Sequence, residues 1–213
     1  MTSDPTKSAP PSRPLARALP DELEAFEALE AELPALEKLN HFTGQADRIS
    51  WFGRLGDPLD QETTALARHY LDALGFPDTD IAQLLSWKDA EAAAQSLDWD
   101  TAAWEAEEQL RAGLTTEALE CLSEEALGLA LTDLTSRLQA TLRNAVEEAA
   151  SLSDETDEAL LTAAAGAGLQ AAYSAALSIA ADAGPDHPCW LKYRLFAAGR
   201  WPVGLAGLSF NLF

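Results

Sequence analysis

Cysteine, methionine and histidine are scarce in this sequence. Its 213 residues include 2 cysteines, 1 methionine and 3 histidines. The two cysteines, Cys121 and Cys189, lie far apart, whereas small secreted domains depend on a dense framework of paired cysteines. The pattern predicts two reduced thiols in a cytoplasmic protein. A chain of this length also buries enough apolar surface to fold without disulfides or a structural metal.

Positive charge is scarce as well, because 14 Lys and Arg face 35 Asp and Glu, for a net charge of −21. Residues 21–160 carry −24 of this charge, residues 1–20 carry +2 and residues 161–213 carry +1. Such a charge repels a phosphate backbone and disfavours direct nucleic-acid binding. Three interpretations of the acidic body stay open: a solvated surface that confers solubility, adaptation to high salt, or recognition of a basic partner.

Motifs that mark common cofactor sites are missing. The sequence has no Gly-x-x-x-x-Gly-Lys-Ser/Thr loop, no Gly-x-Gly-x-x-Gly turn and no Gly-x-Ser-x-Gly elbow. No histidine follows a glutamate by three positions, as ferritin-like di-iron sites require. His187 and Cys189 are two residues apart, but a structural zinc site needs two further ligands. We therefore expect no cofactor and no metal site.

One long uncharged run is present, at residues 159–181. It is long enough to cross a membrane, but Ala, Gly, Ser and Thr dominate it and Gln170 lies near its middle. This composition predicts a buried helix rather than a membrane span. Residues 1–20 contain five prolines and lack the apolar core of a secretory signal, which predicts a flexible, Pro-rich tail.

Helical spacing begins directly after this tail. Asp21 and Glu24 form a capping-box pattern, and apolar residues recur behind it at helical intervals. Pro34 is expected to kink or split the helix, because proline lacks the amide hydrogen that the helix needs. Several glycines then predict an irregular connector over residues 40–60.

Shorter helices are expected to follow the connector. Asp60 precedes the first of them, Ser86 can cap the next, and Asp98 or Asp100 can cap the one after that. Trp104 is spaced for burial on this last helix.

The longest helical pattern covers residues 115–183 and predicts two long antiparallel helices. Its first part is an apolar stripe with alternating steps of three and four: Leu127, Leu131, Leu134, Leu138, Leu142 and Val146. Its second part is a row of small residues four apart, which permits close helix approach: Ala164, Gly168, Ala172, Ala176 and Ala180.

The chain ends in a segment with strand character. Residues 200–213 contain two short apolar runs joined at Ala206 and Gly207, which predict a β-hairpin that packs on the helices. The fold class is therefore mainly α: an antiparallel helical bundle or irregular helical array with a short C-terminal β-hairpin. We expect one helical domain over residues 21–213, preceded by the tail of residues 1–20.

One helix face carries weak candidates for catalysis or metal binding. Glu62, His69 and Asp72 fall on roughly the same side of the helix that follows Asp60. In so acidic a helix, such neighbours also arise as an ordinary solvated face.

The C-terminal region concentrates residue types that are common at interaction hot spots. Trp190, Tyr193, Arg194, Arg200 and Trp201 lie within twelve residues on the least acidic part of the chain. The alternative is structural: the tryptophans seat the hairpin in the core, and the basic groups pair with the protein's own acidic surface.

These features together predict an acidic, cytoplasmic protein–protein interaction module without catalytic activity. Its expected partner is a protein. A basic protein is compatible with the acidic body, as is an adaptor, immunity or inhibitor-like role. No membrane association is expected, and self-association is compatible with the sequence. The alternative is a helical-bundle enzyme, or a ligand- or metal-binding protein, that uses Glu62, His69 and Asp72.

Overall fold

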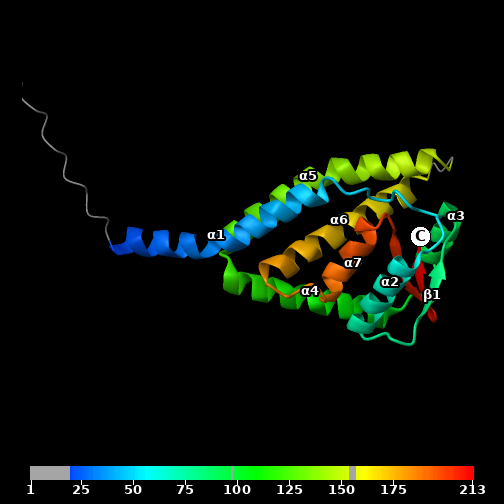
Figure 1. Ribbon diagram of the computed structural model, residues 1–213, viewed down its shortest axis with the longest axis horizontal. Coiled ribbons are helices and arrows are strands. Elements are labelled where there is room, and N and C mark those ends of the chain that lie inside the picture. The colour runs from blue at the N-terminus through cyan, green and yellow to red at the C-terminus, as the bar shows by residue number, and fades with distance from the viewer. Residues whose placement is uncertain (1–19, 97, 154–156) are drawn as a thin grey trace, which may run out of the picture. The chain divides into compact units, whose positions relative to one another are not determined.

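A computed structural model describes residues 20–96, 98–153 and 157–213 (Figure 1). The chain divides into two compact units, Met1–Ala31 and Glu32–Phe213. Seven helices and a three-stranded sheet make up the described residues, which confirms the mainly α fold with a short C-terminal hairpin. Apart from Pro20, the predicted tail lies outside the described residues.

The helices follow one another along the chain. Their bounds are α1 (Pro20–Ala46), α2 (Gln61–Leu74), α3 (Trp87–Ala94), α4 (Thr101–Cys121), α5 (Glu124–Ser151), α6 (Glu158–Ala180) and α7 (Pro188–Ala197). Each helix from α2 onward begins behind a side chain that accepts a backbone amide hydrogen bond. These N-caps are Asp60, Ser86, Asp100, Ser123, Asp157 and His187.

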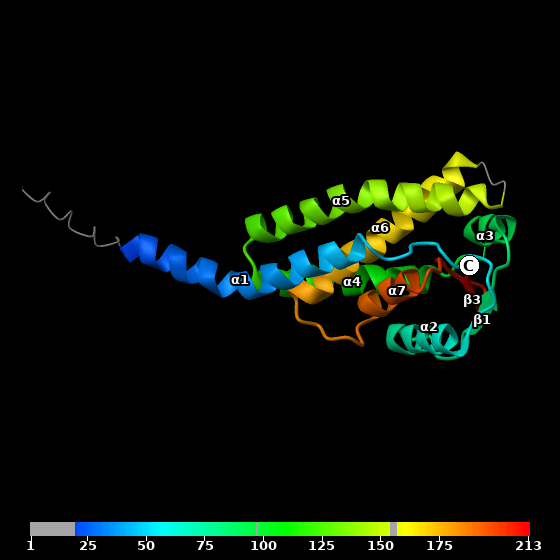
Figure 2. The same cartoon turned by 45° about the horizontal axis from the view of Figure 1, so that its top comes forward.

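Helices α5 and α6 form the predicted antiparallel pair, side by side in both ribbon views (Figures 1 and 2). Every residue of the predicted apolar stripe on α5 is buried. The row of small residues on α6 is buried too, and a Cβ atom built on Gly168 would lie 2.8 Å from Leu142 Cδ2. The two helices can therefore pack closely because glycine and alanine occupy their contact.

Helix α6 is the described helix that is long and apolar enough to cross a membrane by length and composition. In the structure, 56% of its most apolar window is buried. Its buried residues pack in the same core as those of α5 and α7. The arrangement is that of a helix inside a protein core.

Helix α1 is not split at Pro34, which was one of the two outcomes that the sequence left open, and it continues through this proline as one helix. It ends at Ala46, so the irregular connector covers residues 47–60 instead of 40–60. Over its second half it lies along α5, since Glu32 accepts a hydrogen bond from Ser123 N and Asp47 accepts one from Thr141. These contacts hold the helix on both sides of the proline, which removes one backbone hydrogen bond locally.

The sheet contains the predicted hairpin and one strand that the sequence did not indicate. Strands β2 (Pro202–Ala206) and β3 (Ser209–Leu212) pair antiparallel, and β1 (Asp80–Gln83) adds to the other edge of β3 in parallel. A strand of four residues carries too little alternation to be recognised alone. It forms because β3 offers it a partner far away in the sequence.

The prediction for Trp104 is wrong, because its side chain is 55% exposed. Its spacing predicted burial, but Ala103, Leu114 and Ala118 form the buried face of α4, and Trp104 lies beside that face. Helix α6 begins behind Asp157, whose side chain accepts hydrogen bonds from the backbone amides of Ala159 and Leu160.

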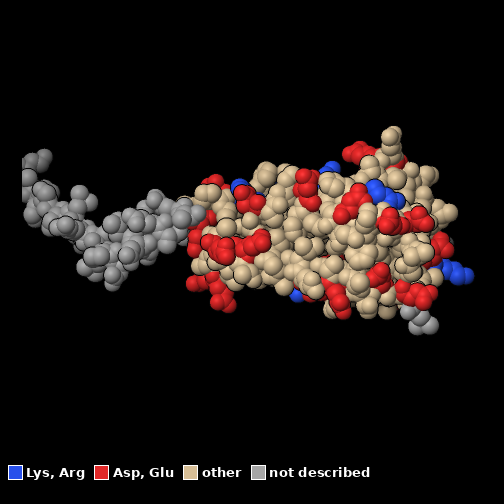
Figure 3. All heavy atoms as spheres, turned by 90° about the horizontal axis from the view of Figure 1, so that it is seen from below, with Lys and Arg blue, Asp and Glu red and all other residues tan. Residues whose placement is uncertain are grey.

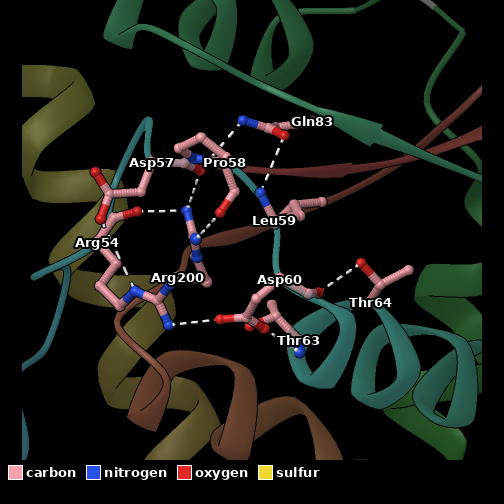
Figure 4. A network of polar contacts seen from close by, with 9 residues as sticks. All are labelled: Arg54, Asp57, Pro58, Leu59, Asp60, Thr63, Thr64, Gln83 and Arg200. Atoms are coloured by element: carbon pink, nitrogen blue, oxygen red, sulfur yellow. Dashed lines mark hydrogen bonds and ion pairs between the residues drawn. The ribbon is translucent and has the colours of Figure 1, made fainter.

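A buried guanidinium ties the connector to the end of α7 (Figure 4). Arg200 is 0% exposed and donates to the backbone carbonyls of Arg54, Asp57 (2.6 Å) and Pro58 (2.9 Å). The amide of Arg54 in turn donates to Gly199 O at 3.0 Å. Four backbone groups of an irregular segment thereby gain partners from one short stretch of chain.

Replacing Arg200 by methionine is expected to lower the free energy of unfolding by about 3–5 kcal/mol, because three carbonyls lose their donor. Urea denaturation measures this as a lower midpoint with an unchanged slope. Arg194→Met is the matched control, because Arg194 is exposed, and should stay within about 0.5 kcal/mol. Equal losses in both variants would contradict the structural role of Arg200.

His187 makes the start of α7 sensitive to pH. Its Nδ1 accepts the amide hydrogen of Cys189 at 3.2 Å, and burial lowers the pKa of His187 below its ordinary value of 6.5. The unfolded chain therefore binds this proton more readily, so stability falls as the pH drops through 6.5 and is full above it. The pH-independent cap His187→Asn should remove this dependence. Thermal unfolding of both proteins between pH 5.5 and 8 tests this, and parallel curves would contradict it.

Candidate functional site

The predicted catalytic candidates on α2 are all solvent-exposed. Glu62, His69 and Asp72 lie on the outer side of the helix, and His69 Nε2 is 3.6 Å from Asp186 Oδ1. Within the described part of the chain, no three His, Cys, Asp or Glu side chains are grouped to hold a metal ion. The three side chains therefore do not form an enclosed site, which the alternative of an enzyme or metal-binding protein would use.

The C-terminal hot-spot residues separate into two groups. Arg200 and Trp201 belong to the interior: Arg200 binds the connector, and Trp201 packs against Trp87 with ring centroids 6.0 Å apart. Both residues therefore have structural roles, although Arg200 binds backbone carbonyls and not the acidic surface that the structural alternative named. The other three, Trp190, Tyr193 and Arg194, come together on α7.

These three residues line an open groove between the end of α1 and α7, which we call the α1–α7 groove. Arg48 and Ile49 form its opposite side, and its volume is about 500 Å³. Trp190 is half-buried and packs on Tyr193, with ring centroids 5.3 Å apart. Burial raises the pKa of Tyr193 to about 12, so its hydroxyl stays protonated at neutral pH.

A separate cleft among α2, α4, α6 and α7 contains a cluster of polar side chains that bond directly to one another. Tyr70 donates a hydrogen bond to Glu107, and Lys192 Nζ lies 2.7 Å from both carboxylate oxygens of Glu107. Glu108 and Arg111 pair beside them at 2.6 Å. The charges of this cleft are therefore matched within the protein.

Cys189 lines the same cleft but is a poor nucleophile there. Burial, together with the negative charge of Glu107, raises its pKa to about 11. Burial also raises the pKa of Tyr70 well above its usual range, with Glu107 adding to the effect. Both groups stay protonated near pH 7, so neither can act as an activated nucleophile or base.

Large apolar side chains are exposed at the tip of the β2–β3 hairpin and on the first turn of α4, which begins beside the hairpin. Trp99 is 37% exposed, Trp104 is 55% exposed and Leu208 is 84% exposed. We call this set the hairpin-tip surface. Its residues come from α4, from the segment that precedes it, and from the hairpin turn.

Backbone hydrogen bonds hold this surface together. Trp99 forms a bridge with Ala206, Asp100 N donates to Leu205 O at 3.1 Å, and Gly207 N donates to Asp98 O at 2.8 Å. The indole of Trp99 lies over Gly204, where a Cβ atom would be 2.5 Å from its Cη2. Only glycine leaves room for this ring, so the tryptophan is fixed against the hairpin.

Two carboxylates flank the hairpin turn. Asp98 accepts the Gly207 amide through its backbone, and Asp80 N donates to Leu208 O at 3.0 Å from the other side. Both side chains are exposed, and neither forms an ion pair with another described residue. Figure 3 shows one face of the molecule, on which Asp and Glu are widespread and Lys and Arg are few.

Sequence reasoning missed most of this surface. Trp99 stands between Asp98 and Asp100, and a tryptophan between two acids is a signal of partial exposure that could have drawn attention to it. Leu208 follows the turn glycine, which favours exposure. That these residues meet could not be known, because the contact of residues 98–100 with β2 is a tertiary one.

No protein family, curated protein or solved structure matches this chain.

The two cysteines should differ strongly in reactivity. Cys121 is exposed and Cys189 is buried. At pH 8 the thiolate fraction of Cys189 is about a hundredfold below that of an ordinary cysteine. Reaction with Ellman's reagent should therefore be fast in Cys189→Ser, which retains Cys121, and at least about a hundredfold slower in Cys121→Ser. Comparable rates in the folded variants would show that Cys189 is accessible and activated.

Proposed function

We propose that this protein is a cytoplasmic protein–protein interaction module without catalytic activity, which binds a basic partner through the hairpin-tip surface. The observation that carries the proposal is the exposure of Trp99 and Leu208 at the hairpin turn, which Asp80 and Asp98 flank with unpaired carboxylates. Trp104 adds a further exposed indole on the adjoining first turn of α4. Both cysteines are free thiols, which fits a reducing compartment.

The apolar part of this surface supports binding energy. Tryptophan is among the residue types that dominate interface energetics, and large exposed apolar groups on a folded protein mark interaction sites. The backbone bonds that fix Trp99 on β2 lower the entropy that binding would otherwise cost. The surface is therefore preorganised for a partner.

The charged part supports the choice of partner. With a net charge of −21 on the chain and unpaired carboxylates at the turn, a basic protein is attracted over long distances and an acidic one is repelled. This distinguishes recognition from an acidic surface that serves only solubility, which needs no apolar centre.

Affinity capture from a lysate of the source organism, with the purified chain as bait, tests the proposal. The wild type should retain a stoichiometric basic partner, and the double variant Trp104→Ala, Leu208→Ser should retain at least about tenfold less of it, because hot-spot truncations cost 2 kcal/mol or more. Asp80→Asn with Asp98→Asn should mainly slow association. Quantitative mass spectrometry measures the retained partner.

Matched controls change the same residue types elsewhere. Leu129 and Leu152 are 65% and 85% exposed, so Leu129→Ser with Leu152→Ser removes apolar surface outside the hairpin tip. Glu124→Gln with Glu125→Gln removes two exposed carboxylates. Full retention of the partner by Trp104→Ala, Leu208→Ser, loss of the partner in the controls, or capture of an acidic partner would overturn the proposal.

A further inference from the structure

Arg48 and Arg194 stand apart from the other cations of the described residues. Most of those Lys and Arg side chains bond to a carboxylate or a backbone carbonyl, as in the pairs Lys38–Asp182 and Lys192–Glu107. Within the described part of the chain, those without such a bond are Arg48, Lys88 and Arg194.

Two of these three free cations meet in the α1–α7 groove. Its lining contains no Asp or Glu, so the groove carries two positive charges on a chain whose net charge is −21. An acidic protein that leaves two guanidiniums unpaired in one groove presents them to an outside anion. Guanidinium groups recognise carboxylates through paired hydrogen bonds.

The groove is also apolar. Trp190 is half-buried and packs on both Phe42 and Tyr193, with ring centroids 5.7 and 5.3 Å away, so its orientation is fixed. Ile49 lines the side that Arg48 provides. A ligand that fits must therefore combine a carboxylate with an aromatic or aliphatic side chain.

The net charge limits the size of the anion. Nucleic acids and anionic membranes present many phosphates, and the acidic body repels them at long range. A short segment with one or two carboxylates meets the two arginines locally without this penalty. A groove of about 500 Å³ is wide enough for a few side chains of such a segment.

We propose that the α1–α7 groove is a docking site for an acidic peptide segment of a second partner protein, with one apolar side chain against Trp190 and carboxylates on Arg48 and Arg194. This site is distinct from the hairpin-tip surface and opposite in charge. Binding in the groove does not depend on a partner at the hairpin-tip surface. If both exist, the protein is an adaptor that holds a basic and an acidic partner at once.

Selection of a phage-displayed library of random 12-residue peptides on the full-length protein tests the groove. Selected peptides should be rich in Asp and Glu next to Trp, Phe or Leu. A synthetic selected peptide, measured by fluorescence anisotropy, should bind Arg48→Glu, Arg194→Glu at least about tenfold more weakly, since interface arginines are frequent hot spots. Trp190→Ala should lose a similar factor.

Lys88→Glu is the matched control, because Lys88 is exposed, unpaired and on α3. It reverses one charge outside the groove and should leave the affinity within about twofold. Thermal unfolding of each variant verifies that it is folded, and Trp104→Ala should bind the peptide as the wild type does. This last variant separates the groove from the hairpin-tip surface.

Several outcomes would overturn the proposal. The first is that the selected peptides are basic or uncharged. The second is that Lys88→Glu weakens peptide binding as much as the groove variant does. The third is that the groove binds inorganic phosphate but no peptide that carries carboxylates. A further one is concentration-dependent dimerisation in sedimentation experiments that Arg48→Glu, Arg194→Glu abolishes, because the occupant would then be a second copy of this chain.

Discussion

The placement of the connector against the end of α7 depends on the buried guanidinium of Arg200. Burying this charge is costly unless the group is fully hydrogen-bonded. Arg200 meets that cost by binding three carbonyls of the connector, while its Nε has no partner among the described residues (Figure 4). The constraint works in both directions, because an irregular segment with free carbonyls could not be buried there without such a donor.

The hydrogen bonds from Arg200 to Arg54, Asp57 and Pro58, which we call the clamp, also affect where neighbouring elements lie. Arg54, on the clamped connector, pairs with Asp60 at 2.9 Å, and Asp60 caps α2. Gln83 at the end of β1 donates to Asp57 O and accepts from Leu59 N. Helix α2 and strand β1 are therefore both tied to a segment that Arg200 holds, and β3, next to β1, leads back to the hairpin tip.

The two proposed binding surfaces share one physical principle. Each combines rigid aromatic side chains with charges that the protein does not neutralise: carboxylates at the hairpin tip and guanidiniums in the α1–α7 groove. The polar cleft shows the opposite situation, since Tyr70, Glu107 and Lys192 satisfy one another. Unpaired charge next to apolar surface thus separates surfaces suited to recognition from networks that stabilise the fold.

Much of the fold was predictable, and the binding surfaces were predictable only in part. Periodicity and caps identified the long α5–α6 pair, the start of α2 at Asp60 and the hairpin, because these depend on neighbours within a few turns. Composition drew attention to Trp190, Tyr193 and Arg194, but it could not separate them from Trp201, which has the same residue chemistry and lies in the core. Arg48 was missed because its segment looked like an irregular connector.

The sequence by itself determined the helical class, the acidic body and the residue types available for binding, since these follow from local spacing and from counting charges. Only the tertiary structure decided which of these residues face solvent and which cations stay unpaired. Trp99 and Leu208 lie close because residues 98–100 pair with β2, and Arg48 meets Arg194 because α1 ends beside α7. Such contacts join residues that are far apart in the chain. They depend on packing and hydrogen bonding between distant segments, and a local sequence pattern contains no information about these interactions.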